Sequence, residues 1–218
     1  MSLLTIEQKN FLQSFFQTYL GTEFFLSGGT ALAEYYLLHR LSQDLDLFTS
    51  NQDLPFDSVN AEVLKIVSSH GLTIENQVTS ETFLRYILAS DENILKIDII
   101  KDTPPHFGKV ENREGVRIDS LENIAVGKLL ALFGRADPKD FVDLYFLFEK
   151  EKIIGFSQTL ILAKKKDLGL QEIYLAEMLS KSETIEIFPP TIKEYQVEKL
   201  RQFFTQLAEK LLLEIKPS

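Results

Sequence analysis

Residues 25–48 read FLSGGTALAEYYLLHRLSQDLDLF, and this stretch decides how the rest of the chain is interpreted. A short apolar segment at 24–26 leads into Ser27-Gly28-Gly29-Thr30, and good helix formers follow over residues 31–38. A second short apolar segment covers residues 45–48. We therefore predict a strand, a glycine-rich loop, a helix and a second strand, in that order.

Two acids, Asp44 and Asp46, are separated by one residue at the second strand. Residues i and i+2 of a strand point to the same face, so both carboxylates are expected on one face, with Leu45 and Leu47 in the core. Two carboxylates on one face repel each other unless a cation lies between them. Because carboxylate oxygens suit hard divalent cations, this pair predicts a Mg²⁺ or Mn²⁺ site.

The glycine-rich loop predicts an anion site next to that cation site. Gly28 and Gly29 allow the main chain to approach a phosphate closely, and the start of the following helix offers unpaired N–H groups. With the aspartate pair, Gly28, Gly29 and Thr30 indicate a site for a nucleoside triphosphate and its metal. For the two glycines alone, a tight turn without a ligand is the alternative.

A third carboxylate, Asp98, lies within the otherwise apolar segment ILKIDII at residues 94–100. Burying a lone acid in such a strand is costly unless it has a partner. We therefore interpret Asp98 as a third metal ligand and as the general base for an attacking hydroxyl. The alternative is an acid at the end of a strand that faces solvent.

Five segments together resemble the AbiEii/AbiGii-type nucleotidyltransferase toxin family, in the same order over about residues 25–148. They are GGTAL at 28–32, HRLSQDLDLF at 39–48, the strand with Asp98, KLLAL at 128–132 and DFVDL at 140–144. The resemblance implies a polymerase-β-like nucleotidyltransferase fold. It also implies Asp44 and Asp46 as metal ligands, with Asp98 as the third acid.

The resemblance extends to residues on the helices that follow. It implies that Lys128 contacts the triphosphate, whereas a solvated helix face is the alternative for this residue. Asp143 is surrounded by apolar positions and is the better candidate for an active-site role on its helix. Asp140 has a structural alternative, because it is an acid in the first turn of a helix that Asp137 caps. The role of Arg135, which shares a helix face with Lys128, stays open.

The chain departs from the family pattern at two positions. Leu38 stands where family members often have glycine, and Lys139 stands where arginine usually precedes the acid. His39 and Arg40 either orient phosphate or pair with nearby acids. We expect Ser42 to hydrogen-bond the loop that presents Asp44. Because neither departure removes a predicted metal ligand, we expect catalysis to be retained.

Hydrophobic periodicity predicts the remaining elements. Helices are expected at 5–19, ended by Gly21, and at 58–70, and strands at 72–78, 82–89, 94–100 and 116–118, with a hairpin turn at Asp91-Glu92-Asn93. From residue 119 onward all segments are predicted helical. They are a helix to 134 with a capping box of Asp119 and Glu122, a helix from Asp137-Pro138 to about 150, and helices at 159–166, 171–179 and 193–216.

The predicted fold class is therefore α+β. A nucleotidyltransferase core at residues 1–118 has a small mixed β-sheet flanked by helices. A C-terminal helical bundle at 119–218 is expected to complete the active site.

Composition excludes several kinds of protein. The chain has 218 residues and no cysteine, so disulfides, thiolate zinc sites and cysteine nucleophiles are excluded. Its three histidines are too few to suggest a metal site built on histidine. The net charge of −9 argues against a nonspecific nucleic-acid binder, and residues 1–150 carry all of the excess, with 22 acidic and 13 basic residues. No apolar run approaches the ~18 residues of a membrane helix, and the first ten residues do not resemble a signal peptide. We expect a cytoplasmic protein.

Three functional hypotheses follow. The first is a nucleotidyltransferase that uses Mg²⁺ or Mn²⁺ and an NTP, releases pyrophosphate, and acts as a toxin on tRNA or another macromolecule beside a cognate antitoxin. The second is an enzyme with a small acceptor such as an aminoglycoside-like antibiotic, because an acidic pocket suits cationic sugars. The third is a module that binds nucleotide without turnover.

Overall fold

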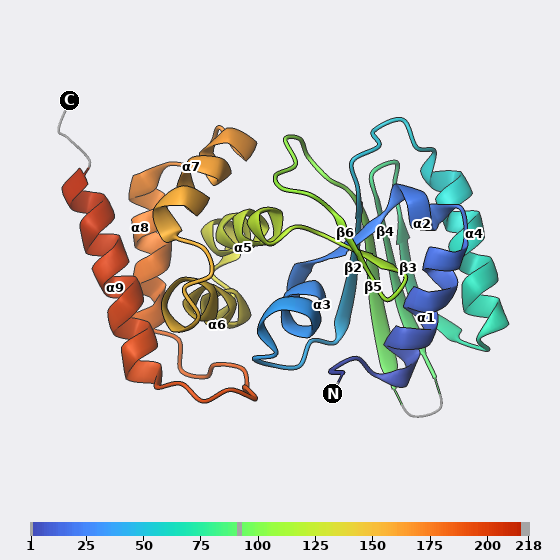
Figure 1. The fold of residues 1–218 in the computed structure, drawn as a ribbon, viewed down its shortest axis with the longest axis horizontal. Helices are drawn as coiled ribbons and strands as arrows, with labels where there is room; N and C mark the ends of the chain where they lie inside the picture. Colours follow the sequence, from blue (N-terminus) through green and yellow to red (C-terminus); the bar gives the residue numbers. More distant parts are fainter. Residues whose placement is uncertain (1, 91–92, 215–218) are drawn as a thin grey trace. The chain divides into compact units, whose positions relative to one another are not determined.

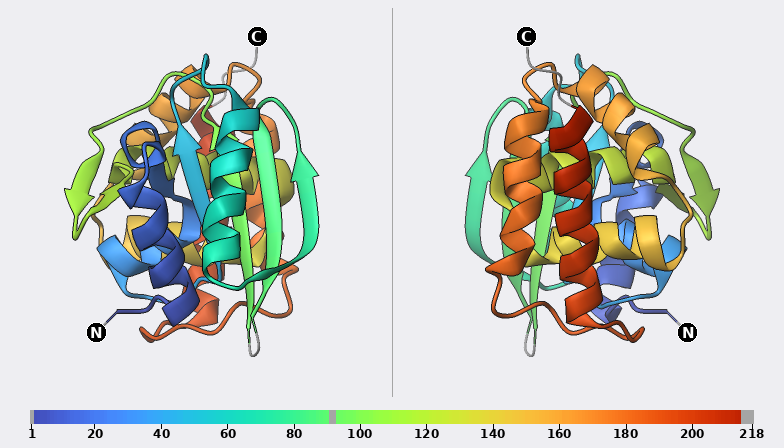
Figure 2. Two further views of the ribbon diagram at one scale, coloured as in Figure 1. Left: turned by 90° about the vertical axis from the view of Figure 1, so that its right-hand side faces the viewer. Right: turned by 90° about the vertical axis from the view of Figure 1, so that its left-hand side faces the viewer.

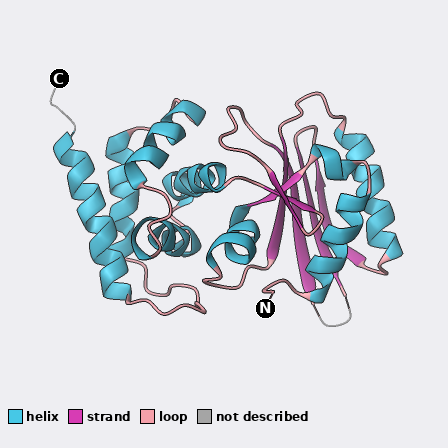
Figure 3. Ribbon diagram, viewed as in Figure 1, coloured by secondary structure: helices cyan, strands magenta, loops and turns pink. Residues whose placement is uncertain are grey.

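The computed structural model describes residues 2–90 and 93–214, and the chain divides into two compact units. The first holds the residues up to Tyr36 together with Leu41–Ser120, and the second holds Leu37–Arg40 and the residues from Leu121 onward. The described strands all belong to the first unit, while helices occur in both (Figures 1 and 3). The predicted α+β class is confirmed.

Among the described residues of the first unit, seven strands form a mixed sheet in the order β3-β4-β5-β2-β1-β7-β6. The strands are β1 (Phe25–Ser27), β2 (Asp44–Thr49), β3 (Thr73–Thr79), β4 (Phe83–Ala89), β5 (Ile94–Lys101), β6 (Glu111–Arg113) and β7 (Val116–Ile118). β2 pairs with β5 in parallel, as β1 does with β7, and the other neighbouring strands are antiparallel. The sequence analysis did not predict β6.

Helices α1 (Ile6–Gln17) and α4 (Phe56–Ser69) pack side by side on one face of this sheet (Figure 2). α1 begins with a capping box, in which Thr5 Oγ1 accepts from the Gln8 main chain and the Gln8 side chain accepts from the Thr5 main chain. Each helix buries an apolar stripe against the sheet. The fully buried members are Phe11 and Phe15 of α1 and Val59 and Val63 of α4.

The central strands separate an apolar face from a polar one. On β2, Leu45 and Leu47 are fully buried and alternate with the partly exposed Asp44 and Asp46, which confirms the predicted alternation. Ile97 and Ile99 of β5 and Leu84, Tyr86 and Leu88 of β4 are likewise buried. Polar side chains of the same strands therefore gather on the opposite face.

The second unit is helical throughout its described elements. They are α5 (Leu121–Arg135), α6 (Pro138–Tyr145) with a π-helical turn at Phe146–Lys150, α7 (Phe156–Lys166), α8 (Glu172–Ser180) with a 3-10 turn at Lys181–Glu183, and α9 (Val197–Glu214). The predicted cap of α6 is confirmed, because the Asp137 side chain accepts from the Lys139 main chain ahead of Pro138. Phe141 of α6 packs edge-on against Phe204 of α9, with ring centroids 5.0 Å apart.

Two glycine-containing segments differ from the sequence prediction. α1 ends at Gln17, and Gly21 lies inside the short helix α2 (Leu20–Glu23). A Cβ at residue 21 would overlap the main-chain carbonyl of Phe16, so glycine is required there for close packing and not to end the helix. A loop is predicted at residues 27–30, but helix α3 (Gly28–Leu32) already begins at Gly28 and continues as a π-helical turn over Ala33–Leu37.

Helix boundaries differ in two further places. α5 begins at Leu121, two residues after the predicted cap Asp119. The Asp119 carboxylate accepts from Ser27 Oγ at 2.6 Å and contacts His106 Nε2 at 2.8 Å, both in the first unit. The last helix begins at Val197 instead of residue 193, and its predicted end at 216 lies outside the described residues. Asp91 and Glu92 of the predicted hairpin turn also lie outside them.

Candidate active site

Strand pairing places four polar side chains in one row across the sheet. Ser27 of β1 stands opposite Asp46 of β2, Asp46 opposite Asp98 of β5, and Asp98 opposite Arg85 of β4. Residues opposite each other on neighbouring strands share a face. We call the acids on this face, Asp44, Asp46 and Asp98, the carboxylate row. The structure thus brings together all three acids that the sequence analysis selected.

The Asp98 carboxylate is paired with cations of the chain. Its side chain is 7% exposed, and Arg85 donates from Nε to Oδ1 and from Nη2 to Oδ2, both at 2.7 Å. Lys96 Nζ lies 3.4 Å from Oδ2 of Asp98 and 2.9 Å from Oδ2 of Asp44. The alternative of a strand-end acid that faces solvent is therefore wrong.

Sequence reasoning missed Arg85 and Lys96, although weak signals for both exist. Lys96 lies two residues before Asp98 and so shares its face of the strand, and Arg85 alternates with buried residues of β4. The acids hold both cations charged. For Lys96, burial lowers the pKa, but the Asp44 hydrogen bond and the nearby Asp98 outweigh it and raise the pKa overall. The hydrogen bond to Asp98 raises the pKa of Arg85 as well.

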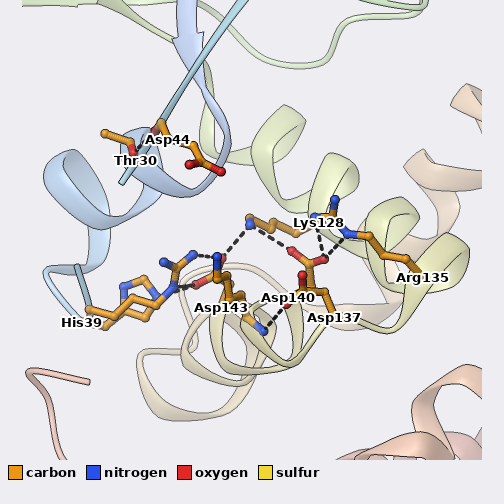
Figure 4. A network of polar contacts seen from close by, with 10 residues as sticks. Thr30, His39, Asp44, Lys128, Arg135, Asp137, Asp140 and Asp143 are labelled. Carbon is orange, nitrogen blue, oxygen red and sulfur yellow. Dashed lines mark hydrogen bonds and ion pairs between the residues drawn. The ribbon is translucent and has the colours of Figure 1, made fainter. Parts of the chain in front are cut away.

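Gly28 lies directly against the carboxylate row. Its φ of +66° is in the left-handed region that favours glycine, and a Cβ at this position would overlap the Asp46 carboxylate. Two residues on, the Thr30 hydroxyl donates to the main-chain carbonyl of Asp44 (Figure 4). Gly28, Gly29 and Thr30 therefore form the first turn of a helix whose residues touch both acids of β2.

The loop that presents Asp44 is held through its main chain. The buried Gln8 of α1 donates from Nε2 to the carbonyls of Ser42 and Gln43, at 3.0 Å each. Sequence reasoning assigned this support to the Ser42 side chain and missed Gln8. The sequence carried no signal for Gln8 beyond its place in the α1 capping box.

Lys128 and Asp143 belong to a buried ionic network within the second unit (Figure 4). Lys128 Nζ lies 2.7 Å from Oδ2 of Asp143 and 3.0 Å from Oδ1 of Asp140, and both carboxylates are fully buried. Asp140 also accepts from Arg135 Nη2 at 3.0 Å. Asp140 is therefore a buried bridge between two cations, which goes beyond a favourable charge in the first turn of α6. The predicted alternative of a solvated face for Lys128 is wrong.

His39 and Arg40 complete this network: of the two roles that the sequence left open, the structure shows pairing with an acid for both. Arg40 donates to Asp143 from Nε at 2.7 Å and from Nη2 at 2.8 Å, and His39 Nε2 lies 2.7 Å from the same carboxylate. These contacts tie residues 37–40 to α6 and explain why the segment belongs to the second unit. Leu38, the departure from glycine, has a φ of +52°, in the region that glycine adopts without strain.

Burial and charge shift the pKa values inside the network. Burial lowers the pKa of His39, and the contact with Asp143 offsets this only in part, so the imidazole is neutral at pH 7. Burial raises the pKa of Asp143, but Lys128, His39 and Arg40 outweigh it and hold the pKa well below the usual value. Asp143 is therefore an anchored anion with cations on several sides.

Within the described residues, no group of three or more His, Cys, Asp or Glu side chains is arranged to hold a metal ion. Asp44 and Asp46 supply hard oxygen donors on one face of β2, which suits Mg²⁺ or Mn²⁺. Lys96 donates to one oxygen of Asp44, whereas Arg85 engages both oxygens of Asp98 on the same face. The donor chemistry of the β2 pair thus fits a divalent cation.

Comparison with known proteins identifies the family. A family model described as "Nucleotidyl transferase AbiEii toxin, Type IV TA system" matches residues 10–212. The chain belongs to the AbiEii nucleotidyl transferase toxin family. The AbiEii chain is also 32% identical over 158 residues to an uncharacterised protein of Aquifex aeolicus (strain VF5), a match that covers 69% of each chain.

Solved structures share the fold of this AbiEii protein. A putative nucleotidyltransferase from Helicobacter pylori gives a TM-score of 0.62 at 20% identity, covering 98% of this chain and 100% of that one. MenT4, a nucleotidyltransferase toxin of Mycobacterium tuberculosis, gives 0.62 at 12% identity, covering 97% and 83%. The polymerase-β-like nucleotidyltransferase fold that the sequence resemblance implied is confirmed.

As a member of the AbiEii family, the protein is a nucleotidyltransferase of the toxin type. The motifs that carried the sequence resemblance all lie within the matched residues 10–212. None of the helices that the structure describes has the length and apolarity needed to cross a membrane.

Proposed function

We propose that the protein transfers a nucleotidyl group from an NTP to an acceptor hydroxyl and releases pyrophosphate, in a reaction that requires a divalent metal ion. The observation that carries the proposal is the carboxylate row, with Gly28 in a left-handed conformation directly against Asp46. Acids for a cation and a main chain free to approach a phosphate thus lie side by side.

Asp44 and Asp46 are the proposed ligands of Mg²⁺ or Mn²⁺, and Asp98 is the third acid of the site. When bound, the divalent ion supplies positive charge that stabilises the attacking and leaving oxygens. Asp98 is proposed to accept the proton of the acceptor hydroxyl. Arg85 donates to both oxygens of Asp98 and so fixes the plane of this carboxylate.

The start of α3 is the proposed contact for the triphosphate. Gly28, Gly29 and Thr30 form its first turn, and the Thr30 hydroxyl ties that turn to the main chain of Asp44. Lys128 is proposed to add positive charge for the phosphates, with Asp143 holding its ammonium group in place. Ser42 belongs to the loop that fixes Asp44, and Gln8 supports that loop.

The proposed acceptor is tRNA or another macromolecule, and the proposed partner is a cognate antitoxin of a type IV system, as the family description suggests. The chain offers limited charge for an RNA surface. Two of the three lysines that end α7 are engaged, Lys164 by Glu172 and Lys166 by Asn123. The contact with RNA is therefore expected to be local.

The test is a transfer assay with each of the four labelled NTPs, Mg²⁺ and total tRNA. The proposal predicts labelled tRNA and released pyrophosphate with at least one NTP. Asp46→Asn should abolish the label while the thermal unfolding temperature stays near that of the wild type. Lys65→Met, which removes an exposed charge on α4, is the matched control and should keep full activity.

Other outcomes point to the alternatives. Label on an amino-sugar panel but not on RNA indicates a small acceptor, which the net charge of −9 favours. Nucleotide binding without pyrophosphate release for any acceptor refutes transfer. Turnover that persists in Asp46→Asn refutes the proposed metal ligands.

A further inference from the structure

Two cations of the chain itself lie within the carboxylate row, and strand pairing fixes their places. Arg85 stands opposite Asp98 in the antiparallel β4–β5 pair, and Lys96 stands opposite Asp44 in the parallel β2–β5 pair. Directly opposite positions bring side chains into contact distance. Both ion pairs therefore follow from the backbone register and not from the choice of a side-chain rotamer.

The Asp98 carboxylate is engaged at both oxygens. Arg85 donates one hydrogen bond to each oxygen at 2.7 Å, and Lys96 lies 3.4 Å from the oxygen that also accepts from Arg85 Nη2. Bidentate guanidinium–carboxylate contacts are among the strongest polar contacts in proteins. The side chain is also 7% exposed. A divalent ion would have to displace Arg85 to reach the carboxylate edge that Arg85 occupies.

The charges of the row lead to the same conclusion. Asp44, Asp46 and Asp98 carry three negative charges, and Arg85 and Lys96 return two positive charges. A second ion bound by protein side chains alone would be repelled by both resident cations.

We propose that Arg85 is the permanent countercation of Asp98, so that the protein alone binds one divalent ion, through Asp44 and Asp46, and Asp98 is not a metal ligand. Lys96 donates to one oxygen of Asp44, Oδ2, at 2.9 Å and lies 3.4 Å from Asp98, whereas Arg85 engages both oxygens of Asp98. The inference rests on the proposed function for the presence of the ion at β2. It replaces the sequence-based assignment of Asp98 to the metal and leaves its role toward the acceptor hydroxyl. Any further divalent ion enters with the triphosphate, whose oxygens supply the ligands.

The test counts Mn²⁺ ions bound to the full chain without nucleotide, by electron paramagnetic resonance of the free ion. We expect one bound ion per chain. Asp98→Asn should leave the Kd for Mn²⁺ nearly unchanged, whereas Asp44→Asn and Asp46→Asn should weaken binding about tenfold or more. Since all three substitutions are isosteric and remove one charge, each controls for the others.

A second variant tests the role of Arg85 as countercation directly. Arg85→Met frees the Asp98 carboxylate, and we expect it to create a second Mn²⁺ site or to tighten the first. Lys65→Met removes a charge outside the row and should change neither the number of ions nor the Kd. Thermal unfolding shows which variants are folded, and if Arg85→Met is not, the Asp98→Asn result decides alone.

Three results would overturn the inference: two Mn²⁺ ions per wild-type chain, no bound ion, or an Asp98→Asn defect as large as that of Asp46→Asn. The transfer assay distinguishes a failure of this inference from a failure of the proposed function. Transfer by a chain that binds two ions overturns only the inference. One bound ion with no transfer to any acceptor overturns only the proposed function.

Discussion

The buried network of the second unit predicts a large loss of stability for Asp143→Asn. The substitution keeps the shape of the side chain but removes a charge that is fully buried. Lys128, Arg40 and His39 all contact this carboxylate, between 2.7 and 2.8 Å. With Asp143 neutral, Lys128 and Arg40 remain buried charges that have lost this partner, while Lys128 keeps its contact with Asp140.

The magnitude follows from that burial. Removing one partner of a buried ion pair costs about 3–5 kcal/mol, because the charges left behind are not solvated. For a chain of this size, 1 kcal/mol corresponds to roughly 2–4 °C in the unfolding temperature. Asp143→Asn should therefore lower the unfolding temperature by about 6–20 °C. The loss of about 3–5 kcal/mol is a large part of the ~5–15 kcal/mol that stabilises a typical domain.

The assay is thermal unfolding of the variant beside Arg135→Met, which removes the exposed partner of Asp140. The Arg135 side chain is 63% exposed, so its pair should contribute at most about 1 kcal/mol. The reasoning is refuted if both variants unfold at the same temperature, or if Asp143→Asn unfolds within about 2 °C of the wild type. A catalytic role without a structural one would appear as lost transfer at an unchanged unfolding temperature.

Three further predictions concern single residues. Gly28→Ala should abolish transfer, because its Cβ overlaps the Asp46 carboxylate, and strain of about 1–2 kcal/mol should lower the unfolding temperature by a few degrees. The free energy of unfolding should fall as the pH drops below about 6.5, because burial lowers the pKa of His39 and the unfolded chain takes up a proton first. Urea unfolding between about pH 5 and 7 should show a smaller drop for His39→Asn. Asp137→Ala should cost about 1 kcal/mol in the same assay by removing the cap of α6, with transfer unchanged.

Local patterns carried most of what the sequence could predict. The alternation in residues 44–47 placed two acids on one face and two leucines in the core, and the structure confirms both. Asp137-Pro138 correctly predicted the start of α6, because a cap and a proline act within a few residues. These signals are short-range, so they can be read without knowing which strands pair.

Contacts between distant parts of the sequence were missed for the opposite reason. His39 meets Asp143 across 104 positions, and Arg85 meets Asp98 across 13. Neither partner is marked by spacing along the chain, because each pair depends on how an entire helix or strand is placed. The loop predicted at residues 27–30 also failed through a distant contact. Glycines usually indicate a loop, but Gly28 is required here by the Asp46 carboxylate, whose approach the sequence does not reveal.

The apolar face of the sheet also fixes the chemistry of its polar face. A slip of one residue between β2 and β5 would turn Leu45 and Leu47 toward solvent and bury Asp44 and Asp46, so burial of the leucines enforces the register. That register sets Asp46 opposite Asp98 and Asp44 opposite Lys96. The same hydrophobic contacts that stabilise the sheet therefore decide which acids meet which cations, and a core substitution that shifts β2 should disturb the site before it unfolds the protein.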